Sequence, residues 1–159
     1  MDDWKKSWSL TRATYDFIRC ALPDGKCILE LGSGWGTSKL SEHYVMNSIE
    51  DNEHWLNKYE SEYIHAKIIP YDKNNPPPDI PGLEKLDQDE QFGWYDINTI
   101  IDGIKDIDYD MIFVDGPKAR IGRGGFLVHL DKFKNDVPII IDDTCSRSEY
   151  ILMEKVAQE

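Results

Sequence analysis

Residues 27–36 read CILELGSGWG, and this stretch decides the fold. Its first half, 27–31, is a short apolar run with the length and composition of a buried strand. Its second half carries three closely spaced glycines, which let backbone N–H groups approach a ligand with no side chain between them. A strand that runs straight into such a loop is typical of nucleoside-binding βαβ units. The same pattern also fits an ordinary strand-to-helix turn.

Apolar runs and amphipathic stretches alternate along the rest of the chain, which predicts an α/β domain with a parallel sheet. Four more strands are expected, at 44–49, 65–71, 109–115 and 137–141. Helices are expected at 9–22, 37–43, 52–63, 95–107, after residue 125 to about 133, and 146–157. The proline-rich stretch 72–94 predicts an irregular flap.

Length and composition indicate one globular domain. The chain has 159 residues, of which 40% are hydrophobic, so residues 1–159 are expected to fold as a single domain that begins with a helical segment at 1–22. The formal net charge of −12 argues against a nucleic-acid partner, because such proteins normally carry a basic surface. No apolar run reaches the ~20 residues that a membrane span needs.

Cysteine usage and the N-terminus favour a cytoplasmic location. Cys20, Cys27 and Cys145 are odd in number and far apart, with no CxxC spacing, so neither a zinc site nor a disulfide is expected. The first residues, MDDWKK, lack the basic-then-apolar pattern of a secretion signal.

Glu50 adds a second nucleoside-binding feature to the glycine loop. It follows the second predicted strand, where a carboxylate in βαβ units accepts two hydrogen bonds from the vicinal hydroxyls of a ribose. With this residue included, the sequence resembles class I S-adenosylmethionine-dependent methyltransferases: 27–36 looks like their first motif, and 47–51 with Trp55 looks like their second strand and ribose acid. The GxGxG spacing favours S-adenosylmethionine over NAD.

That resemblance implies a set of cofactor contacts. Glu30 and Gly32 would lie near the methionine moiety, Glu50 would hold the ribose, and Ser33, Gly34, Gly36 and Asp115 would complete the cofactor site. Asp72, placed just after the third predicted strand, is a candidate for the adenine end. A solvated loop acid explains Asp72 equally well.

Three aspartates follow the last two predicted strands. Strands one, four and five are expected to be neighbours, so Asp115, Asp142 and Asp143 should converge beside the methyl donor. Three carboxylates in one place repel each other unless a cation lies between them, and oxygen ligands without Cys or His suggest Mg²⁺ or another hard divalent cation. Each aspartate taken singly also fits a helix cap or a turn.

This acidic set resembles the metal-dependent O-methyltransferases of the catechol and caffeoyl-CoA type. The resemblance implies that Asp115, Asp142 and Asp143 hold the metal and that Lys118 is the catalytic base, with Asp115 as the other catalytic candidate. Asp143 stands where that group has Asn, and the Gly116–Pro117 turn differs from theirs. The VDGP and IDD strings also resemble bacterial sugar-associated methyltransferases.

Two further features have a functional and a plain interpretation. Arg120 and Arg123, in the glycine-rich loop after the fourth strand, suit an anionic or sugar substrate, or are part of a mobile solvated loop. Trp94 and Tyr95 could form a substrate wall, although packing aromatics explain them more simply.

The sequence therefore predicts a Rossmann-like parallel sheet of order 3-2-1-4-5 with helices on both faces. The usual sixth and seventh strands of the family are missing, which suggests a short member or a piece of a longer protein. The expected function is methyl transfer from S-adenosylmethionine to a hydroxyl of a small molecule or sugar, assisted by a divalent cation. The alternatives are a non-catalytic nucleoside-binding domain and a nicotinamide-dependent oxidoreductase. Strand 137–141 is expected at an apolar sheet edge, covered by a second subunit in a homodimer or by the proline-rich segment.

Overall fold

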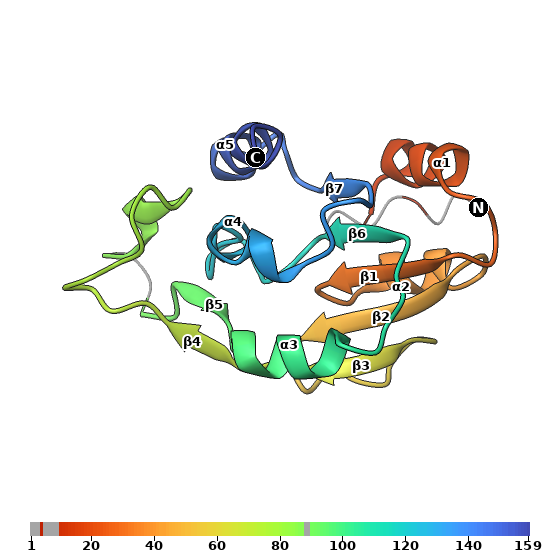
Figure 1. Ribbon diagram of the computed structural model, residues 1–159, viewed down its shortest axis with the longest axis horizontal. Coiled ribbons are helices and arrows are strands. Elements are labelled where there is room, and N and C mark those ends of the chain that lie inside the picture. Colours follow the sequence, from red (N-terminus) through yellow and green to blue (C-terminus); the bar gives the residue numbers. More distant parts are fainter. Residues whose placement is uncertain (1–3, 5–9, 88–89) are drawn as a thin grey trace.

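The computed structural model describes residue 4 and residues 10–87 and 90–159. Its centre is a five-stranded sheet of order β3-β2-β1-β6-β7 in which every neighbouring pair is parallel. The strands are β1 (Cys27–Leu31), β2 (Val45–Glu50), β3 (Glu62–His65), β6 (Met111–Val114) and β7 (Ile139–Ile141). This is the predicted order of the five strands. Their carboxyl ends face one side, where a small antiparallel sheet of β4 (Ile68–Pro70) and β5 (Gly93–Tyr95) lies (Figure 1).

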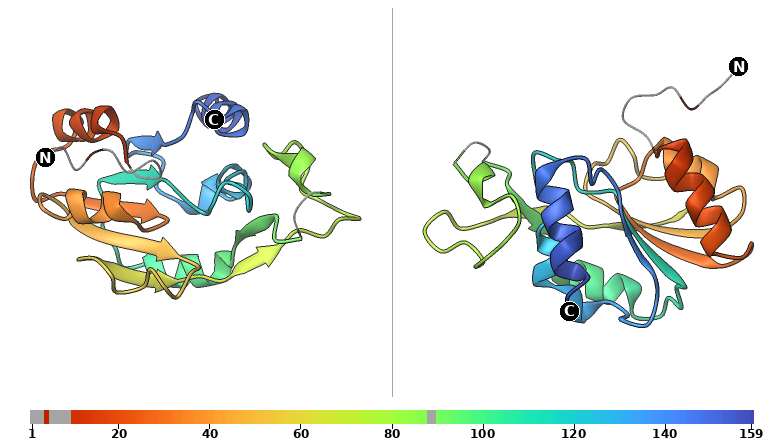
Figure 2. Two further views of the ribbon diagram at one scale, coloured as in Figure 1. Left: turned by 180° about the vertical axis from the view of Figure 1, so that it is seen from behind. Right: turned by 90° about the horizontal axis from the view of Figure 1, so that it is seen from above.

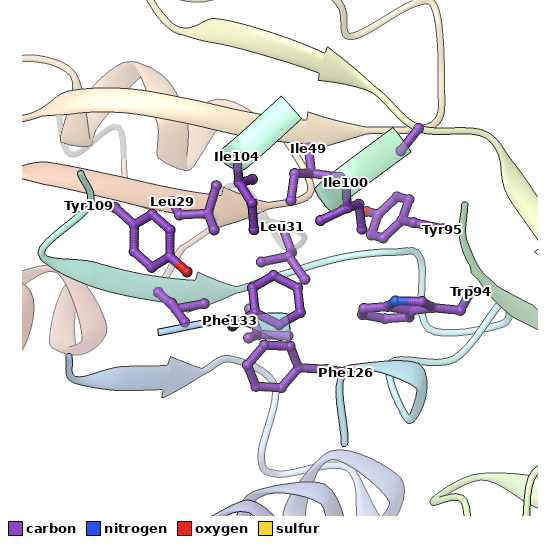
Figure 3. Packing of buried hydrophobic residues seen from close by; sticks show 13 residues of the cluster. Leu29, Leu31, Ile49, Trp94, Tyr95, Ile100, Ile104, Tyr109, Phe126 and Phe133 are labelled. Atoms are coloured by element: carbon purple, nitrogen blue, oxygen red, sulfur yellow. The ribbon is translucent and has the colours of Figure 1, made fainter. Parts of the chain in front are cut away.

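Helices pack on both faces of the large sheet because successive side chains of each strand point to opposite faces. On one face, α1 (Arg12–Ala21) and α2 (Trp35–Leu40) contribute Ile18 and Leu40 to a cluster that includes Ile28 and Phe113. The other face carries α3 (Ile97–Ile104), α4 (Gly125–Val128), η3 (Leu130–Lys132) and α5 (Arg147–Val156). Figure 3 shows the second cluster, in which α3 and α4 meet side chains of β1, β2 and the small sheet.

The predicted helix at 52–63 is wrong: the structure has only turns and bends there before β3 begins. Trp55 and Tyr59 are spaced as on a helix, but their rings stack on each other across a turn. Asn57 has a φ of 57°, a left-handed conformation that interrupts an α-helix. The Asn52 side chain also accepts a hydrogen bond from the His54 N–H, a local turn that competes with helix formation.

The third strand of the large sheet is displaced from its predicted position at 65–71. β3 ends at His65, and the following apolar residues form β4, which pairs antiparallel with β5 in the small sheet. Consequently the predicted helix at 95–107 also starts later: Asp96 caps α3 by accepting from the Asn98 N–H, and the Asp96 N–H donates to the Lys67 carbonyl. These contacts connect β3, β5 and α3 at the carboxyl edge of the sheet.

The segment between β4 and β5 projects from the end of the molecule opposite α1 (Figure 2). Within its described residues, 71–87 and 90–92, the only helical turn is η2 (Leu83–Lys85). Lys85 donates to the Ala119 carbonyl and to Ser148, and Lys155 donates to the Asp79 carbonyl. The segment is therefore attached to the loop after β6 and to α5. None of the described helices is long and apolar enough to cross a membrane.

Candidate functional site

A cleft of about 510 Å³ lies at the carboxyl edge of the sheet. Its walls come from the end of β2, the end of β3, Gln91 shortly before β5 and the loop after β6. The lining residues are Asp51, Asn52, Glu53, His65, Lys67, Gln91, Lys118, Arg120 and Ile121. Clefts of about 300–1,000 Å³ at this edge of a parallel sheet are where α/β domains bind small molecules. Of the lining residues, only Lys118 and Arg120 are among those that the sequence singled out.

The three glycines after β1 meet different surroundings. Gly32 has a φ of +88°, and a Cβ on it would lie 2.8 Å from the Cα of Gly116. A Cβ on Gly36 would lie 2.9 Å from the Cβ of Leu10, so helix packing requires the small residue there. Gly34 is different, because nothing lies within 4 Å of a Cβ built on it and its φ of −168° is open to any residue. Its lack of a side chain leaves open space above the loop.

The N–H groups of this loop are partly used within the chain. The Gly32 N–H donates to the Ile49 carbonyl, the Ser33 N–H to the Glu50 carboxylate and the Gly34 N–H to Thr37. These hydrogen bonds fix the loop to β2 and α2. The three N–H groups are therefore already used, and what the loop presents to a ligand is mainly a surface without side chains.

Glu50 is held in place from two sides. Its Oε2 accepts from the Ser33 N–H at 2.8 Å and its Oε1 from the Asn52 N–H at 2.8 Å. Burial raises the pKa of its carboxyl, which those two backbone hydrogen bonds partly offset. A carboxylate has about four acceptor positions, so each oxygen keeps capacity for a ligand hydroxyl. Glu50 is therefore held against the glycine loop with acceptor capacity left, at the position where the resemblance expects a ribose.

Glu30 is buried one strand away and has its own partners. Its Oε2 accepts from Thr37 at 2.8 Å and from Ser48 at 2.7 Å. Burial raises the pKa of its carboxyl to about 8, against the effect of these two hydrogen bonds. The protonated form therefore dominates at neutral pH in the free protein. A cationic ligand nearby would favour the ionised form.

Arg123 lies among the three predicted metal ligands. Its Nη2 donates to the Asp143 carboxylate at 2.9 Å and to the Asp115 backbone carbonyl at 2.6 Å, and lies 3.4 Å from the Asp115 carboxylate. Its Nη1 donates to the Asp142 backbone carbonyl at 3.1 Å. The Arg123 side chain is only 4% exposed. The sequence placed Arg123 in a solvated or substrate-binding loop, whereas the structure buries it against the strand ends.

This arrangement fits a divalent cation poorly. The guanidinium places one positive charge against the carboxylates of Asp115 and Asp143, and it would repel a metal cation beside them. Within residues 10–87 and 90–159, no group of three or more His, Cys, Asp or Glu side chains is arranged to hold a metal ion. The metal site on Asp115, Asp142 and Asp143 stays a prediction that these contacts do not favour.

Asp115 and Lys118 differ in their surroundings. Burial raises the pKa of the Asp115 carboxyl to about 7, with Arg123 lowering it and the neighbouring acids raising it further. Its side chain remains 26% exposed at the end of β6. Lys118 lines the cleft with Asp51: burial raises the pKa of the Asp51 carboxyl, and the charge of Lys118 opposes that rise. Of these two candidate bases, Asp115 lies at the strand end beside the glycine loop.

Asp72 lies outside this group of residues. It follows β4 and not the third strand of the large sheet, and it is exposed. Its carboxylate accepts from the Asn74 N–H and its carbonyl from the Asn75 N–H, which makes it a turn residue of the projecting segment. Ala66 and Lys67, not Asp72, directly follow the third strand of the large sheet.

Trp94 and Tyr95 are packing aromatics, the simpler of the two interpretations that the sequence allowed, although they lie on β5 and not on a helix. Both are 2% exposed and belong to the core cluster of the α3 face (Figure 3). The Tyr95 hydroxyl reaches the glycine contact itself, because a Cβ on Gly116 would lie 2.6 Å from it. The sequence expected Tyr95 at the start of a helix, whereas it belongs to β5, which pairs with β4.

Comparison of the chain with protein-family models, curated proteins and solved structures gives no match. The functional argument therefore depends on the geometry of the site.

Proposed function

We propose that this chain binds S-adenosylmethionine and transfers its methyl group to a hydroxyl of a small molecule or sugar. The observation that carries the proposal is the hydrogen bond from the Ser33 N–H to Glu50 at 2.8 Å. It holds an acid of β2 against the glycine loop of β1, beside the open space above Gly34. That combination supports recognition of a ribose at the carboxyl edge of the sheet.

The bound cofactor would supply a methyl group activated by a sulfonium charge. The acceptor oxygen forms the new bond to the methyl carbon, the sulfur–carbon bond breaks, and the hydroxyl proton must go to a base. Asp115 suits that task because its side chain is partly exposed at the end of β6. Arg123 would hold the Asp115 backbone and carboxylate in position. We assign no step to a metal ion.

Calorimetric titration with S-adenosylhomocysteine tests the binding part of the proposal. Glu50→Ala removes an acceptor of charge-assisted hydrogen bonds and should weaken binding roughly tenfold or more. Glu62→Ala makes the same charge change at the exposed amino end of β3 and serves as the control. Equal affinities in the wild type and Glu50→Ala would place the ligand elsewhere, and tighter binding of NAD would favour an oxidoreductase.

A non-catalytic nucleoside-binding domain is the second candidate. It is favoured by the contacts of Arg123, which engage Asp115 and Asp143 within the chain. Incubation with S-adenosylmethionine and a panel of sugars and catechols, with measurement of S-adenosylhomocysteine release, separates the two. Release that depends on an acceptor and is lost in Asp115→Asn supports methyl transfer. Binding without release supports the second candidate.

A further inference from the structure

The cleft at the carboxyl edge of the large sheet gathers positive charge in an otherwise acidic chain. Three of its lining residues are cations, Lys67, Lys118 and Arg120, and two are carboxylates, Asp51 and Glu53. The whole chain has the opposite balance, with 18 Lys and Arg against 30 Asp and Glu. Salt screens charges that are more than about 8 Å away at physiological ionic strength, so a ligand in the cleft would respond mainly to the lining residues.

The two lysines of the cleft have ammonium groups that the fold does not use. Within residues 10–87 and 90–159, the side chains of Lys67 and Lys118 form neither a hydrogen bond nor an ion pair, and both are exposed. Lysines elsewhere, such as Lys26 and Lys134, donate to aspartates. The cleft therefore offers a ligand ammonium donors that need not first break an internal contact.

The loop that carries Lys118 and Arg120 is packed against the projecting segment. A Cβ on Gly122 would lie 2.6 Å from Cε2 of Phe92, so the loop backbone lies directly on that ring. The Arg120 Nη2 donates to Gln91 Oε1 at 3.0 Å, which holds the guanidinium on the wall of the cleft. Cations that are positioned before the ligand arrives lose less conformational entropy on binding.

The cleft also adjoins the proposed ribose position. Asn52 lines it, and the Asn52 N–H donates to Glu50 Oε1 at 2.8 Å. The carboxylate of Asp51 and the amides of Asn52 and Gln91 suit hydroxyl groups, whereas the three cations suit an anion. A phosphate ester carries a charge of about −1.5 to −2 near pH 7 and three strong acceptor oxygens, so it matches three cations better than a carboxylate does.

We propose that this cleft binds the phosphate group of a small phosphorylated molecule such as a sugar phosphate, with Lys67, Lys118 and Arg120 as the side chains that hold the phosphate. Lys67 comes from the end of β3 and the other two from the loop after β6, so the anion would be held from two sides. The inference goes beyond the proposed function, because phosphate binding needs no S-adenosylmethionine. Under the proposed function, and resting on it, the phosphorylated molecule would be the methyl acceptor.

Amide chemical-shift titrations at constant ionic strength test the inference with three probes: glucose, glucose 6-phosphate and inorganic phosphate. Lys118→Gln and Lys67→Gln each remove one cation and should weaken binding of glucose 6-phosphate roughly tenfold. Lys105→Gln removes the same charge from an exposed lysine that does not line the cleft, so its affinity should equal that of the wild type. Wild-type melting temperatures would show that the three variants fold.

Asp51→Asn provides a variant with the opposite expected effect. It removes a negative charge from the same cleft and should strengthen binding of inorganic phosphate by about threefold. A gain of affinity cannot come from a damaged fold. Weaker binding in Asp51→Asn would count against a phosphate in this cleft.

The probes distinguish the sources of the phosphate group. Tighter binding of glucose 6-phosphate than of inorganic phosphate supports a sugar phosphate, and equal binding keeps the phosphate site but assigns it to the free anion. If neither anion binds, if glucose binds as tightly as its phosphate, or if Lys105→Gln loses as much affinity as Lys118→Gln, the inference is overturned. None of these results depends on S-adenosylhomocysteine binding, so the inference and the proposed function can fail separately.

Discussion

Gly32 and Gly116 meet backbone to backbone where β1 and β6 end, so closely that a Cβ on Gly32 would lie 2.8 Å from the Gly116 Cα and 2.8 Å from its nitrogen. Backbone hydrogen bonds hold both loops in place: the Gly32 N–H donates to the Ile49 carbonyl, and the Asp115 N–H donates to the Leu31 carbonyl. The contact therefore fixes the distance between the glycine loop and the proposed base.

The glycines of the loop should separate stability from binding. Gly32→Ala places a Cβ against Gly116 at a positive φ and should lower the free energy of unfolding by at least about 2 kcal/mol. Gly34→Ala meets nothing within 4 Å and should unfold like the wild type, yet weaken S-adenosylhomocysteine binding by filling the open space. Urea unfolding and calorimetric titration measure the two effects. Wild-type binding by Gly34→Ala would show that the ligand does not pass over this residue.

Arg123 should be one of the most stability-determining side chains of the protein. Arg123→Met removes the donor of the Asp115 and Asp142 carbonyls and the cation beside Asp115 and Asp143, and should lower the free energy of unfolding by at least about 2 kcal/mol. Arg120→Met removes the same charge from an exposed side chain of the same loop. It should change the free energy of unfolding by no more than about 0.5 kcal/mol. Urea denaturation of the three proteins tests this, and equal losses would mean that Arg123 is not buried against the aspartates.

The same variant tests the metal prediction. In the wild type, Arg123 already places a positive charge beside Asp115 and Asp143, so millimolar Mg²⁺ should leave the melting temperature unchanged. Arg123→Met exposes the uncompensated carboxylates of Asp115 and Asp143 to a metal ion, so Mg²⁺ should raise the melting temperature of the variant. Stabilisation of the wild type by Mg²⁺ that is lost in Asp142→Asn would instead support the metal site that the sequence predicted.

Glu30 should make the free protein less stable as the pH rises. Its carboxyl has a pKa near 4.5 in the unfolded chain and about 8 in the fold, so between these values the folded state holds a proton that the unfolded state has lost. The contribution of Glu30 to the free energy of unfolding is therefore complete below about pH 4.5 and is lost as the pH approaches 8. Between these values the free energy of unfolding falls by about 1.4 kcal/mol for each pH unit.

Glu30→Gln tests this pH dependence. Glutamine resembles the protonated acid in shape, and its carbonyl oxygen can accept from Thr37 and Ser48. The variant should lose less stability than the wild type between pH 6 and pH 8.5, as followed by urea unfolding at each pH. Parallel losses in the two proteins would assign the pH dependence to other groups, of which Asp115 is the first to examine.

The sequence predicted most of the large sheet because its strands are buried on both faces and read as continuous apolar runs. It failed at 52–71, where the spacing of Trp55 and Tyr59 imitates a helix and where the left-handed Asn57 prevents one. The placement of the glycine loop after β1 and of Glu50 at the end of β2 was predictable because both are adjacent to strands. The burial of Arg123 was not, since it depends on how the loop after β6 folds over the ends of β6 and β7.

The apolar edge strand β7 leads to the last prediction. Among the described contacts, the projecting segment bonds to α5 and to the loop after β6, so the structure offers no sign that this segment covers the edge. Pro138, which lacks an N–H, does not remove a donor from the outer side of this edge. Its carbonyl accepts from the Ile112 N–H, so its missing N–H lies on the side of β6 and not on the outer side.

The outward N–H groups of β7 therefore belong to Ile139 and Ile141, since backbone groups alternate between the two sides of a strand. We predict that a second copy of the chain covers them, because an unpaired apolar edge favours association. Amide exchange at Ile139 and Ile141 should slow as the protein concentration rises, in parallel with dimer formation in sedimentation. The Asp142 N–H, bonded to Val114 at 3.0 Å, should stay protected at every concentration and serves as the internal control. If Ile139 and Ile141 exchange freely in a sample that remains monomeric, the edge is tolerated by the single chain and the dimer prediction is wrong.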